Sequence, residues 1–292
     1  MTDLPWTKSY PPGVRWDPEL PILSVQHILD NAADRWPDHT ALSFMGRKLS
    51  YRQLQDSVNQ AAKGFQKLGV KPGVHVGLYL PNTPHYVISF FGILKAGGTV
   101  VNYSPLDAER VLGHKIEDSQ TDFIVTLDLV SLYPQVRNML EQTRLQKIIL
   151  GSVAQMSAQP DAVNAHLQQA DLLATVAWDA QHIPFNQLLD NDAAFQAYPI
   201  NDPATSLAVL QYTGGTTGLP KGAMLTHGNL SAATAQIMST VNGDQQVLEE
   251  GAERLLAVLP LFHIYAMTVN MLFGLRIGAE LVLHVKFELA AV

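Results

Sequence analysis

The chain has 292 residues, of which 47% are hydrophobic and 15% are charged, so it is long and apolar enough for a globular fold with a large core. Its formal net charge of −7 argues against a nucleic-acid-binding protein, because such proteins usually present a basic surface. It contains no cysteine, which excludes disulfides and thiolate chemistry and is consistent with a cytoplasmic protein.

The chain begins with a segment of little periodicity. Residues 1–21 contain five prolines and two tryptophans, which predicts an extended arm on the surface of the body. No basic start followed by an apolar stretch is present, so the segment does not resemble a signal peptide.

Helix and strand patterns alternate through most of the remaining sequence. Ser50 followed by Gln53 is the pattern of a capping box. Thr83 before Pro84 indicates another helix start, and Asn229 is predicted to cap a further helix. The predicted helices cover residues 24–36, 51–68, 84–95, 106–118, 132–142, 229–241 and 264–275. The predicted strands cover residues 42–45, 48–50, 74–80, 99–102, 123–126, 147–150, 207–210, 222–226, 255–259 and 281–285.

This alternation, with short turns between the elements, predicts an α/β fold in which helices cover both faces of a mostly parallel sheet. The pattern weakens over residues 151–182, which predicts an insertion that is helical in part. We expect residues 1–200 to form a first α/β subdomain, with a junction near 183–203, and residues 201–292 to begin a second one.

Residues 255–275 contain no Asp, Glu, Lys or Arg and are long enough to cross a bilayer. However, Pro260, His263 and Asn270 interrupt the stretch. We therefore predict a strand, a loop and a buried helix rather than a membrane span.

A glycine- and threonine-rich segment, residues 212–222, reads Tyr-Thr-Gly-Gly-Thr-Thr-Gly-Leu-Pro-Lys-Gly and follows an apolar strand. Its glycines let the backbone approach a ligand, and its hydroxyls and Lys221 suit the oxygens of a polyphosphate. It is not a P-loop of the kinase and ATPase type, because Pro220 precedes the lysine and Gly222 follows it. A hairpin loop without a ligand stays open as the alternative.

This segment resembles the signature loop of the adenylate-forming superfamily, which includes acyl- and aryl-CoA ligases, luciferases and the adenylation domains of peptide synthetases. The variant found here most resembles bacterial long-chain fatty acid–CoA ligases. Further stretches resemble family blocks in family order: Leu49-Ser-Tyr-Arg-Gln-Leu, Leu94-Lys-Ala-Gly-Gly-Thr-Val-Val-Asn and Leu259-Pro-Leu-Phe-His-Ile-Tyr-Ala. The resemblance implies the N-terminal domain of the adenylate-forming fold, a layered αβαβα arrangement truncated before the C-terminal domain.

The resemblance also implies roles for individual residues. Lys221 and His263 would be catalytic, with His263 beside the acyl-adenylate, and Met267 would line the acyl tunnel. A histidine or methionine buried in the core is the alternative for these two positions. Thr213 would help to hold Mg²⁺. The residues lining the ATP phosphates would be Tyr212, Thr213, Gly214, Gly215, Thr216, Thr217, Gly218 and Lys221.

The implied chemistry has two steps. A fatty acid carboxylate attacks ATP to give an acyl-adenylate and pyrophosphate, and the thiol of coenzyme A then displaces AMP. The partners are therefore a fatty acid, ATP with Mg²⁺, and coenzyme A, with no nucleic acid. A homodimer and peripheral contact with the inner face of a membrane stay open, although no basic amphipathic helix argues for the latter.

Members of this family continue with an adenine-binding segment, an acidic magnesium ligand, an aspartate for the ribose and a C-terminal domain with a lysine. None of these is found before Val292, so we expect an N-terminal fragment that cannot complete the ligase reaction alone. A medium-chain or aryl-CoA ligase and a non-catalytic nucleotide- or acyl-binding remnant stay open as alternatives. A P-loop kinase or ATPase is disfavoured.

Overall fold

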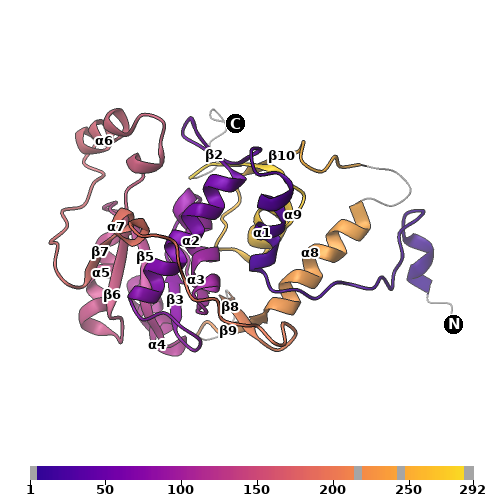
Figure 1. Cartoon of the computed structure of the whole chain (residues 1–292). Helices are drawn as coiled ribbons and strands as arrows, with labels where there is room; N and C mark the ends of the chain where they lie inside the picture. The colour runs from indigo at the N-terminus through magenta and orange to yellow at the C-terminus, as the bar shows by residue number, and fades with distance from the viewer. Residues whose placement is uncertain (1–4, 214–218, 242–246, 286–292) are drawn as a thin grey trace.

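The computed structural model describes residues 5–213, 219–241 and 247–285 (Figure 1). The α-helices of this part are α1 (Gln26–Arg35), α2 (Tyr51–Lys67), α3 (Pro84–Lys95), α4 (Glu109–Asp118), α5 (Tyr133–Gln142), α6 (Pro160–Gln169), α7 (Phe185–Leu189), α8 (His227–Val241) and α9 (Phe273–Arg276). The strands are β1 (Thr40–Phe44), β2 (Arg47–Ser50), β3 (His75–Leu78), β4 (Thr99–Asn102), β5 (Thr121–Leu127), β6 (Lys147–Gly151), β7 (His182–Pro184), β8 (Leu207–Tyr212), β9 (Gly222–Thr226), β10 (Arg254–Ala257) and β11 (Glu280–Leu283). Two short 3-10 helices and a π-helix complete the set: η1 (Pro5–Ser9), η2 (Ala154–Met156) and η3 (Ala266–Leu272).

The strands form two sheets. A seven-stranded sheet has the order β7-β6-β5-β3-β4-β8-β9 and is parallel except for the β8–β9 hairpin. A four-stranded sheet has the order β10-β11-β1-β2, and the predicted β1–β2 hairpin is its antiparallel pair. The expected mostly parallel α/β fold is thus confirmed.

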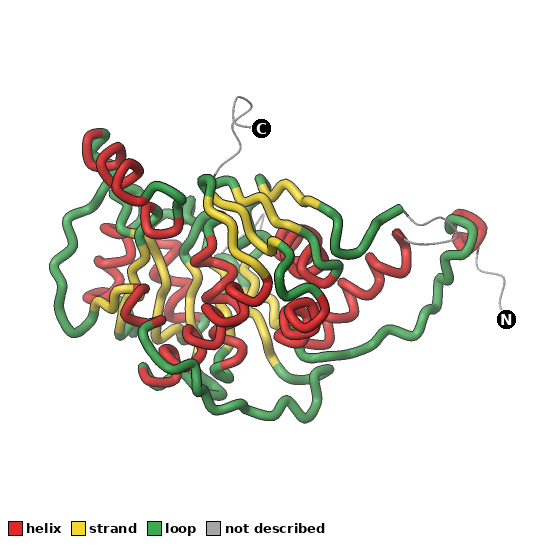
Figure 2. Tube along the Cα trace, turned by 45° about the horizontal axis from the view of Figure 1, so that its top comes forward, coloured by secondary structure: helices red, strands yellow, loops and turns green. Residues whose placement is uncertain are grey.

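Helices lie between the two sheets and on the outer face of the larger one. The chain runs from β3 through α3 to β4 on one side, then returns through α4 to β5 on the other side of β3, and right-handed crossovers put α3 and α4 on opposite faces. Helix α2 packs on α3 and also contacts β1 and β2. The layers therefore run helix, sheet, helix, sheet, and Figure 2 shows the red helices between and around the yellow strands.

The two sheets do not divide the chain at residue 200. Strands β8 and β9 join the same sheet as β3 to β7, whereas β10 and β11 pair with β1 from near the start of the chain. The insertion at 151–182 holds η2 and α6, as predicted, and α6 has no buried residue. The division into subdomains at residues 1–200 and 201–292 stays a prediction.

Helix starts follow local capping chemistry. At α2, the Ser50 hydroxyl accepts from the Gln53 N–H at 3.2 Å and the Gln53 side chain accepts from the Ser50 N–H at 2.9 Å, which confirms the predicted capping box. At α8 the prediction was wrong by two residues. The helix begins earlier, and Asn229 instead accepts from the N–H of Thr226, whose hydroxyl accepts from the Asn229 N–H. Thr83 precedes α3 as predicted, but its buried hydroxyl makes no capping bond.

The N-terminal arm is extended, as expected, and in Figures 1 and 2 it runs away from the body beyond α8. Its tryptophans, Trp6 and Trp16, stay about half exposed at 55% and 49%. Just after the arm the chain is fastened to α8, where the N–H of Leu23 donates to the Ser231 hydroxyl and the N–H of Val25 donates to His227.

Residues 255–275 form β10, a turn, η3 and α9. No helix in the described part of the chain is both long and apolar enough to cross a membrane. The predicted helix over 264–275 exists, but Ala266–Leu272 adopts the π form, which periodicity does not distinguish from an α-helix.

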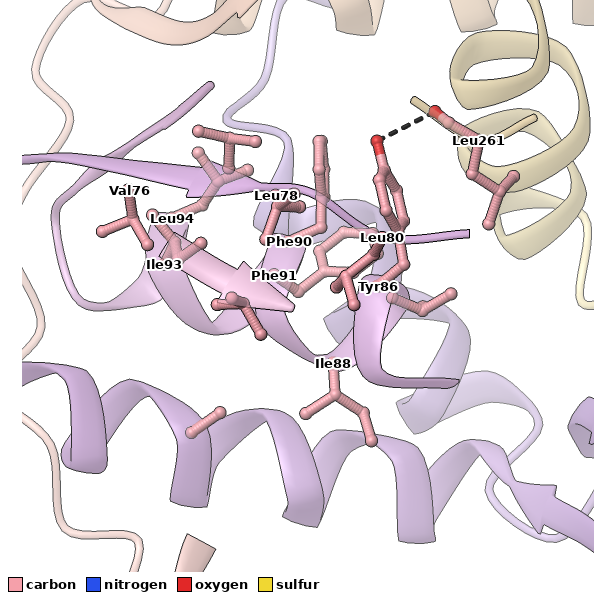
Figure 3. Close-up of a cluster of buried hydrophobic side chains, with 14 of the residues drawn as sticks. Val76, Leu78, Leu80, Tyr86, Ile88, Phe90, Phe91, Ile93, Leu94 and Leu261 are labelled. Atoms are coloured by element: carbon pink, nitrogen blue, oxygen red, sulfur yellow. Dashed lines mark hydrogen bonds between the residues drawn. The ribbon is translucent and has the colours of Figure 1, made fainter. Parts of the chain in front are cut away.

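The centre of the molecule is α3, all twelve residues of which are buried. Figure 3 shows its side chains packed against those of β3, together with a hydrogen bond from Tyr86 to the backbone of Leu261. The segment before η3 is therefore fastened to the core of the fold, and this segment carries His263.

One side chain of α3 gives the fold a pH dependence. His85 is fully buried and neither of its ring nitrogens has a hydrogen-bond partner, so burial lowers its pKa to about 3 from the ordinary 6.5. Between these values the unfolded chain binds a proton that the folded chain does not, and stability falls as the pH drops below 6.5.

We expect His85 to lower the free energy of unfolding by about 2 kcal/mol between pH 7 and pH 5, as measured by urea denaturation. His85→Leu should remove this part of the pH dependence, and replacing the exposed His166 in the same way should leave it unchanged. An unaltered pH slope in His85→Leu would contradict the assignment. Buried His227, whose pKa is lowered to about 4 by burial, contributes in the same direction.

Candidate functional site

The glycine- and threonine-rich segment connects β8 to β9 as a hairpin. Its two ends are held together, because the N–H of Thr213 donates to the carbonyl of Lys221 at 3.1 Å and Tyr212 pairs with Gly222. Both Thr213 and Lys221 are exposed. The other residues predicted to line the phosphates lie outside the described residues: Gly214, Gly215, Thr216, Thr217 and Gly218.

His263 lies in the turn that leads from β10 to η3. Its backbone N–H donates to the Pro260 carbonyl at 2.9 Å, and its ring is exposed. The ring Nδ1 accepts from the N–H of Tyr265 at 3.3 Å. An accepting Nδ1 leaves Nε2 as the protonated nitrogen of the neutral ring, so that nitrogen can donate to a ligand.

A pair of buried amides connects the hairpin to the His263 turn. Gln211, two residues before Thr213, donates through Nε2 to the carbonyl of Phe262 at 3.0 Å. Its Oε1 accepts from Asn102 Nδ2 at 2.9 Å. Asn102 and Gln211 are paired residues at the carboxyl ends of the adjacent parallel strands β4 and β8. This edge of a parallel sheet is where α/β proteins bind their ligands.

Two further side chains fix the segment between β10 and His263. Asn82 donates from Nδ2 to the carbonyls of Ala257 and Leu259, both at 2.9 Å, and accepts from the N–H of Leu261 at 2.7 Å. Tyr86 donates to the Leu261 carbonyl at 2.8 Å, with the Asn102 amide oxygen 2.9 Å away. Burial raises the pKa of Tyr86 far above its usual value, so its hydroxyl remains a donor.

Met267 is fully buried in η3. Its Sδ accepts from Asn102 Nδ2 at 3.4 Å, so the methionine reaches the same amide as Gln211. The structure therefore brings Met267 next to the site predicted from the sequence, and its π-helical backbone is a conformation that recurs at functional sites. Whether it borders an acyl chain stays a prediction.

Tyr212 directs its hydroxyl to the last turn of α4, where it bonds to Oδ2 of the exposed Asp118 at 2.6 Å and to the Lys115 carbonyl at 3.2 Å. Burial, followed by the neighbouring Asp118, raises the pKa of this hydroxyl above its usual value. Since the ring is buried and its hydroxyl is bonded elsewhere, Tyr212 borders the segment mainly through its backbone and ring face.

The described part of the hairpin offers few protein ligands for a magnesium ion. Among the described residues no group of three or more His, Asp or Glu side chains could hold a metal. Thr213 offers one exposed hydroxyl at the end of β8. A single protein oxygen fits Mg²⁺, which keeps most of its ligands as water and phosphate oxygens.

A family model described as AMP-binding enzyme matches residues 29–291. The chain belongs to the AMP-binding enzyme family. A long-chain-fatty-acid–CoA ligase from Bacillus subtilis (strain 168) is 35% identical over 294 residues, which cover 97% of this chain and 50% of that protein. A probable 4-coumarate–CoA ligase 1 from Dictyostelium discoideum is 28% identical over 290 residues, which cover 97% of this chain and 48% of that protein.

Among solved structures, a long-chain-fatty-acid-CoA ligase from Archaeoglobus fulgidus superimposes with a TM-score of 0.74 at 23% identity, over 96% of this chain and 50% of that one. This likeness shows the fold, which is that of the N-terminal domain of adenylate-forming enzymes. The chain spans about half the length of the curated relatives it matches.

Four polar residues around the hairpin and the His263 turn were missed by sequence reasoning: Asn82, Tyr86, Asn102 and Gln211. A signal for two of them was present, because Asn102 ends the run Thr-Val-Val-Asn and Gln211 follows the apolar run Leu-Ala-Val-Leu. A polar side chain at the carboxyl end of a buried parallel strand points to a ligand site. Asn82 and Tyr86 have no such signal.

Proposed function

We propose that this chain supplies the phosphate-binding and carboxylate-positioning residues of an AMP-forming long-chain fatty acid–CoA ligase. The observation that carries the proposal is the link from Gln211 to the carbonyl of Phe262, because it joins the end of the hairpin to the turn of His263. The segment with the composition of a polyphosphate site and the histidine beside it thus meet at the carboxyl edge of one parallel sheet.

In this proposal Lys221, His263 and Thr213 each have a different chemical role. The ammonium group of Lys221 offsets charge on the β- and γ-phosphates as pyrophosphate leaves, and backbone N–H groups of the hairpin donate to phosphate oxygens. The Nε2–H of His263 donates to the substrate carboxylate and orients it towards the α-phosphorus. Thr213 supplies one oxygen ligand to Mg²⁺, which adds positive charge at the phosphates.

The turn of His263 must hold its position for this orientation to work. Asn82 and Tyr86 bind its backbone from buried positions on the N-terminal side and first turn of α3. Because these contacts are made by side chains of the fold itself, they would orient the histidine towards the carboxylate and lower the cost of bringing the two groups together.

Palmitate-dependent exchange of labelled pyrophosphate into ATP tests the first step. The proposal predicts incorporation of label that needs both palmitate and Mg²⁺. Formation of ADP and phosphate independent of any carboxylate would contradict it and would indicate an ATPase. A folded sample that binds ATP but exchanges no label would favour a non-catalytic nucleotide-binding remnant.

A medium-chain or aryl-CoA ligase is the second candidate, favoured by the 28% identity with a protein named as a probable 4-coumarate–CoA ligase. A series of carboxylates from octanoate to palmitate, together with 4-coumarate, separates the two in the same exchange experiment. The long-chain proposal predicts the highest exchange with palmitate.

A further inference from the structure

Tyr212 is in contact with both ends of the hairpin segment. It directly precedes Thr213, and across the hairpin it is paired with Gly222, the residue after Lys221. A Cβ atom at position 222 would lie only 3.3 Å from Cζ of the Tyr212 ring, so this ring packs against the returning strand. Any displacement of the ring therefore moves both ends together.

Three side chains hold this ring, and two of them come from α4. The Tyr212 hydroxyl bonds to Asp118 Oδ2 at 2.6 Å and to the backbone carbonyl of Lys115 at 3.2 Å. Nζ of Lys115 lies 5.3 Å from the ring centroid, in cation–π geometry. The ring of Tyr103 stacks against it with centroids 6.3 Å apart and an interplanar angle of 26°.

Lys115 and Asp118, the two charged residues of α4 that contact Tyr212, stand in different surroundings, because Lys115 is buried and Asp118 is exposed. Lys115 is buried and paired at 2.6 Å with Asp107, and burying an ion pair seldom stabilises a fold more than apolar packing does. Asp118 is the last residue of α4, where the helix dipole disfavours a carboxylate. The dipole that disfavours Asp118 favours Lys115, which stands in the last turn of the same helix. The helix therefore gives no reason for the carboxylate of Asp118, whereas its contact with Tyr212 does.

We propose that Asp118 and Lys115 are positioning residues that fix Tyr212, and through it hold Thr213 and Lys221 at a set separation before the phosphates bind. The inference rests on the proposed binding of ATP phosphates at this hairpin. If Thr213 and Lys221 already stand at the right separation, ATP need not order them when it binds. Fixing these two ends of the hairpin therefore raises the affinity for the phosphates.

The first test follows the hydrogen-exchange rate of the Thr213 amide, which is bonded to the Lys221 carbonyl, well below the melting temperature. Tyr212→Phe and Asp118→Ala should each accelerate this exchange about tenfold, as expected for the loss of a hydrogen bond to a charged group. The double variant should be no faster than Tyr212→Phe alone, because that substitution already removes the bond to Asp118 together with the bond to the Lys115 carbonyl. Asp118→Asn retains an acceptor oxygen and should recover most of the protection.

Tyr103→Phe is the matched control. It removes another buried hydroxyl from the same cluster, one that bonds to Ser119 and Thr121 rather than to the hairpin contacts, and it retains the stacked ring. We expect its Thr213 exchange to stay within about twofold of the original rate. Equal acceleration in this control, or unchanged exchange in Asp118→Ala, would overturn the proposal.

The second test is the dissociation constant of Mg·ATP by calorimetry. Tyr212→Phe and Asp118→Ala should weaken binding about fivefold to tenfold, and Tyr103→Phe should not, although all three lower the melting temperature. If the original chain binds no ATP, the proposed function fails, and the exchange measurement still decides whether Asp118 positions the hairpin. Unchanged affinity in Tyr212→Phe with normal binding by the original chain would count against the positioning role.

Discussion

Replacing Lys221 with alanine is expected to weaken the binding of Mg·ATP by at least about tenfold, because a hydrogen bond from a charged group contributes about 1.5–3 kcal/mol and tenfold in affinity corresponds to about 1.4 kcal/mol. The lysine closes the hairpin through its backbone carbonyl, which accepts from Thr213, so the substitution should leave the fold intact. Isothermal calorimetry measures the affinity, and the urea denaturation midpoint checks the fold.

A surface lysine away from the hairpin provides the control. Lys71 is exposed in the turn before β3, so Lys71→Ala removes the same charge from the molecule without touching the hairpin. Its affinity for Mg·ATP should match that of the original chain. If both variants lose affinity equally, the effect belongs to net charge and Lys221 has no direct contact with the phosphates.

Replacing Asn82 with alanine is expected to lower the free energy of unfolding by about 3 kcal/mol, because three buried hydrogen bonds are lost at about 1 kcal/mol each. The side chain is 2% exposed and serves the carbonyls of Ala257 and Leu259 and the N–H of Leu261. The loss also frees the turn of His263. Urea denaturation measures the stability, and hydrogen exchange at Leu261 reports the turn.

Asn138→Ala serves as the comparison for this prediction. Asn138 lies on α5 and its amide donates at 3.3 Å and 3.4 Å to the Glu109 side chain rather than to a backbone group. We expect it to cost less than about 1 kcal/mol. A loss in Asn82→Ala that is no larger than in this control would show that the three bonds do not hold the turn.

Much of the fold could be predicted because its signals are local. The capping box of Ser50 and Gln53 involves residues three positions apart, and the alternation of apolar strands with helices appears directly in the sequence. The same local signal misled at α8. Thr226 and Asn229 are both capping residues three positions apart, so either could be read as the N-cap, and the structure shows that they serve each other.

The site was predicted less completely, because its contacts join distant parts of the chain. The sequence indicates Thr213, Lys221 and His263 by composition and resemblance. It gives no sign that Asn82 bonds to the backbone of Ala257, which is 175 positions away. Contacts of that kind depend on how α3 packs beneath the turn, and no local pattern of a single sequence encodes them.

The most direct measurement is hydrogen exchange across the whole chain with and without Mg·ATP and palmitate. If the hairpin and the turn of His263 form one site, protection should concentrate in residues 207–226 and 257–267 and should require the nucleotide. Protection confined to another surface, such as the cavity of about 320 Å³ bordered by Tyr198 and His227, would contradict the proposed site. So would a folded chain in which nucleotide alters no amide.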